Sequence, residues 1–196
     1  MKRSSSETGV IDDAKRIAVL AAPVRTELAT TLEALGGAAT VAELAKRLGR
    51  SADGLYYHLR AMLRAGLLEE DSGPGGRRYR LATPGPQAVR LLYKPGATAN
   101  ARAVARVASS ASRLAQRDFS RALQRPSTTV EGPARELWMA RLTGWVDTSE
   151  LKEINRLLQQ LADLLAAARP TKNGKLIALQ WILAPIDAKP VRRSRT

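Results

Sequence analysis

The fold is decided by residues 40–82, which read TVAELAKRLGRSADGLYYHLRAMLRAGLLEEDSGPGGRRYRLA. A first helix is predicted to begin at Thr40, because Thr40 and Glu43 have the spacing of a capping box. It is predicted to end at Gly49, since glycine accepts the left-handed backbone that closes many helices. Ser51 is a favourable N-cap for a second helix directly after this turn.

A β-hairpin is predicted to follow the two helices. Its first strand begins at residues 67–68, and its second strand is the alternating segment 77–81. Between them, residues 72–76 are rich in glycine and turn the chain back. Two short helices followed by a basic hairpin are typical of a winged helix-turn-helix, in which the second helix enters the major groove of DNA.

The second helix is predicted to present different side chains on its two faces. At ~100° per residue, the apolar side chains lie within ~40° of one another. They are Leu55, Leu59 and Met62. The opposite face, at roughly 140–200° from Leu55, carries polar side chains. They are Asp53, Tyr57, Arg60 and Arg64.

These polar side chains suit contacts with DNA. Arginine binds guanine edges or phosphates, and tyrosine donates to a phosphate or packs on a thymine methyl. Asp53 either accepts from a cytosine amine or stabilises the helix N-terminus. The expected DNA-binding residues are Ser51, Asp53, Tyr56, Tyr57, Arg60 and Arg64 on the helix, and Arg77, Arg78 and Arg80 on the wing. The alternative is a solvated face on a small three-helix domain.

The segment from Leu20 to Glu69 resembles the ArsR-type winged-helix transcriptional regulators. Those proteins read L-x-x-P-x-R, then a helix, then ELA-x-x-LG-x-S and HL-x-x-L-x-x-AGL. The matching residues here are Leu20, Pro23, Arg25, Glu43, Leu44, Ala45, Leu48, Gly49, Ser51, His58, Leu59, Ala65, Gly66 and Leu67. The resemblance covers roughly the first 85 residues and implies a dimeric, cytoplasmic, DNA-binding regulator. It departs from metal-sensing members, because this chain has no Cys and one His.

Composition favours a nucleic-acid partner. The 196 residues carry a net charge of +14, with a pI near 11.0. Such a balance suggests a polyanion, nucleic acid first and an anionic membrane surface second. The absence of cysteine excludes disulfides and thiolate chemistry, and no apolar run approaches the ~20 residues that span a bilayer. With no G-x-S-x-G elbow and no phosphate-binding glycine loop, we expect neither an enzyme nor a cofactor or metal site.

The domain organisation follows from breaks in composition. Residues 1–10 are expected to be a disordered arm and residues 11–85 the winged helix-turn-helix, supported by helices at 11–21 and 23–35. Residues 86–97, with their prolines and glycines, are expected to be a linker. Residues 98–190 then form a C-terminal dimerisation or effector domain, and residues 191–196 a basic tail.

The C-terminal half is predicted to contain one long helix and a strand-helix-strand unit, resembling the extension of some ArsR-like regulators. The long helix covers residues 98–124. A strand at 134–146 (with a short helix as the alternative), a helix capped by Asp147, and a strand at 176–186 follow. Three tryptophans, either core or lining a ligand site, are Trp138, Trp145 and Trp181. The fold class is mainly α with small β components (α+β).

The sequence thus predicts a cytoplasmic, sequence-specific transcriptional regulator. It is expected to bind double-stranded DNA as a homodimer on a palindromic site, with helix 51–64 in the major groove and wing 69–82 on the backbone or minor groove. The expected partners also include a small-molecule effector, and no membrane is expected among them. The alternatives are a winged-helix module that binds a protein, and a non-specific nucleic-acid binder driven by charge.

Overall fold

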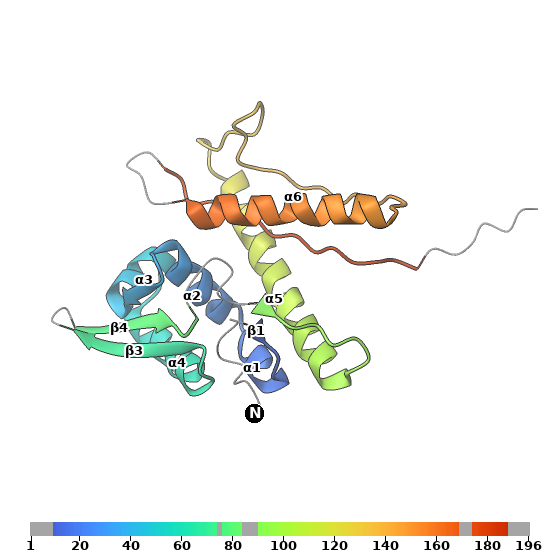
Figure 1. The fold of residues 1–196 in the computed structure, drawn as a ribbon. Coiled ribbons are helices and arrows are strands. Elements are labelled where there is room, and N and C mark those ends of the chain that lie inside the picture. The colour runs from blue at the N-terminus through green and yellow to red at the C-terminus, as the bar shows by residue number, and fades with distance from the viewer. Residues whose placement is uncertain (1–9, 74–75, 84–89, 169–173, 188–196) are drawn as a thin grey trace, which may run out of the picture.

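The computed structural model describes residues 10–73, 76–83, 90–168 and 174–187 (Figure 1). In chain order its elements are β1 (Val10–Ile11), α1 (Ala14–Val19), α2 (Pro23–Ala34), β2 (Ala38–Thr40), α3 (Val41–Leu48), α4 (Ala52–Arg64), β3 (Leu68–Gly73), β4 (Gly76–Leu81), β5 (Arg90–Leu91), α5 (Thr98–Leu123) and α6 (Thr148–Ala167). The expected class, mainly α with small β components, is confirmed. No helix among these residues is long and apolar enough to cross a membrane.

The helix boundaries around the helix-turn-helix are confirmed in detail. Glu43 N–H donates to the Thr40 hydroxyl at 3.2 Å, and Thr40 N–H donates back to the Glu43 carboxylate at 2.7 Å, so the capping box is complete. Gly49 closes α3 with a φ of 61°. Ser51 then caps α4 by accepting from Gly54 N–H at 3.4 Å.

A small antiparallel sheet packs beside α2, α3 and α4, with strand order β2-β4-β3. β3 and β4 form the expected hairpin, in which Leu68 pairs with Leu81 and Glu70 with Tyr79. The third strand, β2, was not predicted; it pairs Ala39 with Tyr79. It connects α2 to α3, and therefore holds the wing against the helices.

One hydrophobic core runs through the N-terminal part of the chain. Its fully buried side chains include Ile17 of α1, Leu28 of α2, Leu44 of α3, Leu59 of α4 and Tyr79 of β4. Ala103 of α5 belongs to the same cluster. Because every helix of the winged helix-turn-helix contributes to this core, α4 is held as part of one rigid unit.

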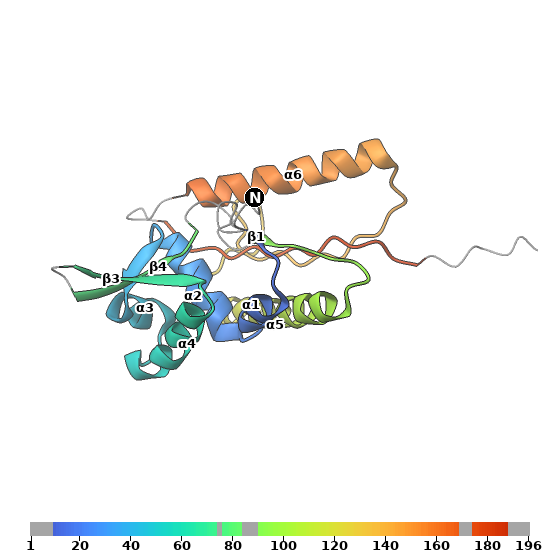
Figure 2. The ribbon, with the colours of Figure 1, turned by 60° about the horizontal axis from the view of Figure 1, so that its bottom comes forward.

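The expected linker includes an ordered connection to α5. Residues 84–89 lie outside the described part of the chain. The next two residues form β5, which pairs in parallel with β1. The buried Asn100 side chain of α5 donates to the Leu92 carbonyl and accepts from Lys94 N–H, both at 2.9 Å. The start of α5 is therefore fixed to the N-terminal unit, beside α1 (Figure 2).

In the C-terminal half the predicted helix is confirmed and both predicted strands are wrong. Asp147 caps α6 in a complete capping box with Glu150. Segments 134–146 and 176–186 contain no regular secondary structure. A β-strand is stabilised by hydrogen bonds to a neighbouring strand. The described part of the same chain places no strand beside these two segments, although their apolar pattern is typical of strands.

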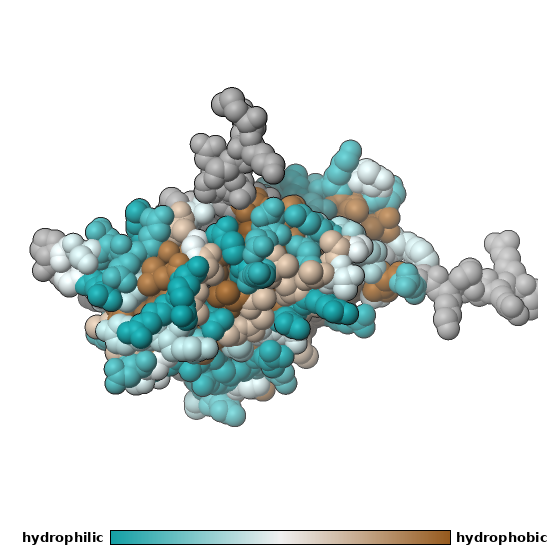
Figure 3. Space-filling model, turned by 90° about the horizontal axis from the view of Figure 1, so that it is seen from below, coloured by the Kyte–Doolittle hydropathy of each residue, from teal (hydrophilic) through white to brown (hydrophobic). Residues whose placement is uncertain are grey.

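The three tryptophans are not in a core within the single chain. Trp138, Trp145 and Trp181 are 71%, 89% and 41% exposed. Figure 3, which views the molecule from below, shows hydrophobic residues in brown at several places on this face. The expected arm and basic tail, residues 1–9 and 191–196, lie outside the described residues, although residue 10 is the first residue of β1.

Candidate nucleic-acid interface

Helix α4 is anchored by one face and exposed on the other. Leu55, Leu59 and Met62 are each 0% exposed. On the other side Tyr57 is 65% exposed, and Arg60 and Arg64 are exposed as well. The two-faced pattern predicted from the sequence is therefore present. A helix fixed along one side by fully buried side chains presents its outer side chains in a defined geometry.

The two arginines on this face carry unneutralised charge. Among the residues that the structure describes, neither Arg60 nor Arg64 takes part in an ion pair. Asp53 lies in the first turn of α4, where its charge favours the helix N-terminus. The Ser51 hydroxyl oxygen is engaged in capping. The positive charge of α4 thus lies toward its middle and C-terminal end.

A cation stacks against the exposed tyrosine. The Arg25 guanidinium carbon lies 5.8 Å from the centroid of the Tyr57 ring. Arg25 itself is held by donating to the Val19 carbonyl at 2.9 Å. The Tyr57 ring also meets the His58 ring edge-on, with centroids 5.3 Å apart. Arg25, a residue of the L-x-x-P-x-R pattern, therefore supports the exposed face of α4 from α2.

The single histidine is a neutral part of this arrangement. Burial, followed by the charges of Arg25 and Arg50, lowers the pKa of His58 below its usual value. Its Nδ1 atom is buried with no hydrogen-bond partner among the described residues. At neutral pH an uncharged imidazole is therefore expected, packed behind Tyr57.

The wing arginines differ from those of α4, because each one contacts a carboxylate. Arg77 pairs with Glu70 at 2.9 Å, and Arg80 with Glu69 at 2.5 Å. Arg78 Nη1 lies 4.0 Å from a carboxylate oxygen of Glu43, and Arg78 also donates to the Ala38 carbonyl at 3.1 Å. The net positive charge of the wing is therefore smaller than its arginine content suggests.

The three wing arginines also divide between two faces. Alternation along β4 places Arg77 on the same face as the buried Tyr79, and Arg78 and Arg80 on the other. A hydrogen bond with the Tyr79 hydroxyl, then the charge of Glu70, raises the pKa of Arg77, with a smaller contribution from Tyr56 of α4. Arg77 is thus the wing arginine that shares its surroundings with the α4 face.

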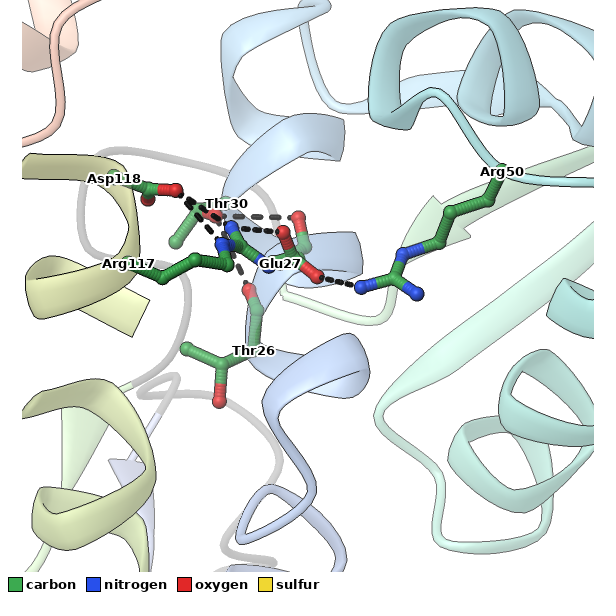
Figure 4. A network of polar contacts seen from close by, with 6 residues as sticks. All are labelled: Thr26, Glu27, Thr30, Arg50, Arg117 and Asp118. Carbon is green, nitrogen blue, oxygen red and sulfur yellow. Dashed lines mark hydrogen bonds and ion pairs between the residues drawn. The ribbon is translucent and has the colours of Figure 1, made fainter. Parts of the chain in front are cut away.

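A partly buried ion network lies behind the helix-turn-helix and was not predicted from the sequence. Glu27 of α2 has a side chain that is 13% exposed. It accepts from Arg50, just before the α4 cap, at 2.9 Å and from Arg117 of α5 at 2.5 Å (Figure 4). Arg117 also pairs with Asp118 at 2.7 Å. Arg50 and Arg117 lie 23 and 90 positions from Glu27 in the sequence, so no local spacing of residues reveals the network.

The hydrogen bonds and charges of this network favour the ionised form of Glu27. Burial alone would raise the pKa of Glu27, but hydrogen bonds from Arg117 and Arg50, together with their charges, bring that pKa below its usual value. The hydrogen bond to Glu27 raises the pKa of Arg117 despite its partial burial. The network therefore stays ionised and links α2, the turn before α4, and α5.

Comparison with known families agrees with this geometry. Residues 20–71 match the family model described as a helix-turn-helix domain. The match spans α2, α3, α4 and the beginning of the wing, and leaves α5 and α6 outside it. No curated protein matches the chain. The chain therefore carries a helix-turn-helix domain of the kind that binds DNA in transcription regulators.

Proposed function

We propose that this helix-turn-helix chain is a sequence-specific transcriptional regulator that reads double-stranded DNA with α4. The observation that carries the proposal is the outer face of α4, where Arg60 and Arg64 are exposed and free of ion pairs among the described residues. A helix with these side chains fits the major groove, where arginine recognises guanine. The resemblance of residues 20–69 to ArsR-type regulators supports the same assignment.

The residues of the interface are proposed to have different roles. Arg60 and Arg64 read bases or bind phosphates from α4, while Tyr57, held by Arg25, packs on a base or donates to a phosphate. Tyr56, Ser51 and Asp53 lie toward the start of the same helix and complete its contact surface. In the wing Arg77 is best placed to reach the same DNA segment, and Arg78 and Arg80 contact backbone from the other face.

A homodimer on a palindromic site is part of the proposal. Two-fold related copies would place their α4 helices in half-sites about one helical turn, ~34 Å, apart or a multiple of it. Phosphate contacts from a chain of net charge +14 make the affinity strongly salt-dependent. A cytoplasmic location and control by a small-molecule effector are consistent with this function.

Two other functions make different predictions. A winged-helix module that binds a protein would select no DNA sequence at any salt concentration. A binder driven by charge alone would lose affinity equally on all sequences when arginines are removed. The contrast between the unpaired arginines of α4 and the paired arginines of the wing favours specific reading by α4, because charge alone requires no such difference.

The test is selection of binding sites from random DNA at ~150 mM salt. We expect the wild-type chain to enrich a palindrome and the Arg60→Ala/Arg64→Ala variant to lose it. The matched control is Arg102→Ala/Arg106→Ala, which removes the same charge from the exposed side of α5. This control keeps the selected sequence. Equal loss in both variants, or no enrichment by the wild type, would refute specific regulation.

A further inference from the structure

The C-terminal part of the chain exposes a large apolar surface. We call residues 134–146, α6 and residues 174–187 together the C-terminal layer. In it Met139, Leu142 and Trp145 are 83%, 90% and 89% exposed. Isolated exposed hydrophobic residues are ordinary, whereas a contiguous group of this kind marks an interaction site.

Helix α6 shows the same lack of cover. None of its residues is buried. Leu151, Leu161 and Leu165, which lie within ~80° of one another on the helix, are 40%, 42% and 38% exposed. Leu164, farther around the helix, is 69% exposed. An amphipathic helix is stabilised in proteins by packing of its apolar face, and the described chain provides that packing only in part, at Ile154 and Leu158, which are half-buried.

The two extended segments of the layer have unpaired backbones. Both run along α6, on the side that faces α5, and both start at the same end, where Glu136 and Lys175 form an ion pair (Figures 1 and 2). The backbone groups of residues 137–146 and 174–187 form no hydrogen bonds with other described backbone groups, and the Gln180 side chain contacts α5 at Ala111 and Ser112. Extended chain with free N–H and C=O groups is a template for pairing with another strand.

We propose that a second copy of this chain covers the C-terminal layer, with extended segments of the two copies pairing as strands and the α6 helices packing their leucine faces. The inference rests on the proposed homodimer and names its surface. Across a two-fold axis a strand pairs with its own copy in antiparallel orientation, so one type of segment supplies both partners. The segments rejected as strands in the single chain would become strands in the dimer.

The charge balance of this region favours a second copy as the occupant. Residues 131–187 contain seven basic and seven acidic side chains, so the whole net charge of +14 lies in the rest of the chain. Two copies therefore meet through this segment without the repulsion that other surfaces would impose. An anionic membrane is a poorer partner, because α6 carries three acidic and two basic residues and membrane-surface helices are rich in Lys and Arg.

The test measures the mass of the full-length chain by sedimentation equilibrium. We expect a dimer of the 21.2 kDa chain, and we expect Leu142→Glu and Leu161→Glu each to raise the dimer dissociation constant by ~10-fold or more. The control is Lys152→Gln. It changes the net charge by the same amount as each variant, and it lies on the side of α6 opposite Leu161, ~180° away. It leaves the dimer unchanged.

A second measurement separates loss of association from misfolding. Leu142 is 90% exposed, so glutamate there should not disturb a single chain, and the circular dichroism signal of the helices should persist. Amide hydrogen exchange should show residues 137–146 or 174–187 protected in the wild type and unprotected in Leu142→Glu. Protection that survives in a monomeric variant would overturn strand pairing between copies.

Binding to a single DNA half-site distinguishes failure of this inference from failure of the proposed function. The monomeric Leu142→Glu variant should still bind a half-site and lose the tighter binding to the palindrome. A wild-type chain that is monomeric up to about 100 μM, or that binds anionic vesicles instead, would refute this interface. Unchanged dimerisation of both leucine variants would refute it equally, while leaving DNA recognition by α4 intact.

Discussion

Arg117, near the end of α5, donates a hydrogen bond to Glu27 of α2 at 2.5 Å, across 90 positions of sequence. The second oxygen of the same carboxylate accepts from Arg50 at 2.9 Å. Arg50 immediately precedes Ser51, the cap of α4. A single carboxylate therefore connects the helix that leads to the C-terminal layer with the turn that positions the DNA-facing helix.

Replacing Glu27 with glutamine should destabilise the chain. Glu27→Gln leaves two guanidinium groups facing an uncharged amide in a site where the Glu27 side chain is 13% exposed. The expected loss in free energy of unfolding is about 1–3 kcal/mol, measured by urea denaturation. Glu153→Gln serves as the control, because the Glu153–Arg156 pair is about half exposed and screened by solvent, so its loss should change the free energy of unfolding much less. Equal losses in the free energy of unfolding for the two substitutions would show that the Glu27 network stabilises the fold no more than an exposed ion pair does.

The same carboxylate should make stability depend on acid pH. The pKa of Glu27 lies below 4.5 in the folded chain, so in acid the unfolded chain binds the proton more readily. Its contribution is complete above pH 4.5 and is lost as the pH falls through the lower folded value. The difference in unfolding free energy between wild type and Glu27→Gln should therefore shrink between pH 6 and pH 3. A constant difference would mean that the ionised carboxylate is not what stabilises the fold.

Local signals in the sequence predicted the elements well. Thr40 with Glu43, and Asp147 with Glu150, are capping boxes that depend only on residues three apart, and both form. The long helix was expected at 98–124 and is found at Thr98–Leu123. Side chains within one or two helical turns interact directly, so their spacing is sufficient evidence.

Features that depend on long-range or intermolecular contacts could not be predicted from the local spacing of residues. The Glu27–Arg117 contact depends on how α2 and α5 pack, and the pairing of β1 with β5 joins two segments that are far apart in the sequence and meet only in the fold. Glu69 and Glu70 neutralise wing arginines across the hairpin, a pairing that depends on the register of the two strands. Segment 134–146 has the composition of a strand, but a strand also requires a neighbour that sequence pattern cannot locate.

The single histidine gives a direct probe of the α4 packing. Because the pKa of His58 is lowered by burial and by Arg25 and Arg50, the unfolded chain takes up its proton first. Stability should thus fall as the pH drops below 6.5 toward the folded pKa. The chain has one histidine, so its proton NMR titration is unambiguous. Arg25→Ala, which removes one of the neighbouring charges, should move the pKa of His58 upward. A wild-type value at or above 6.5 would contradict the packing described behind Tyr57.

The acidic residues of the wing should limit its affinity for DNA. Glu69 and Glu70 pair with Arg80 and Arg77 at 2.5 Å and 2.9 Å, so Glu69→Gln/Glu70→Gln releases both arginines for phosphate contacts. We expect tighter binding of the selected site and a steeper dependence of log affinity on log salt, by about 0.9 for each new contact. The control is Glu131→Gln/Glu153→Gln, which makes the same charge change outside the wing and should leave the slope unchanged. An unaltered slope in the wing variant would show that its arginines do not reach phosphate, and DNA recognition would then rest on α4 alone.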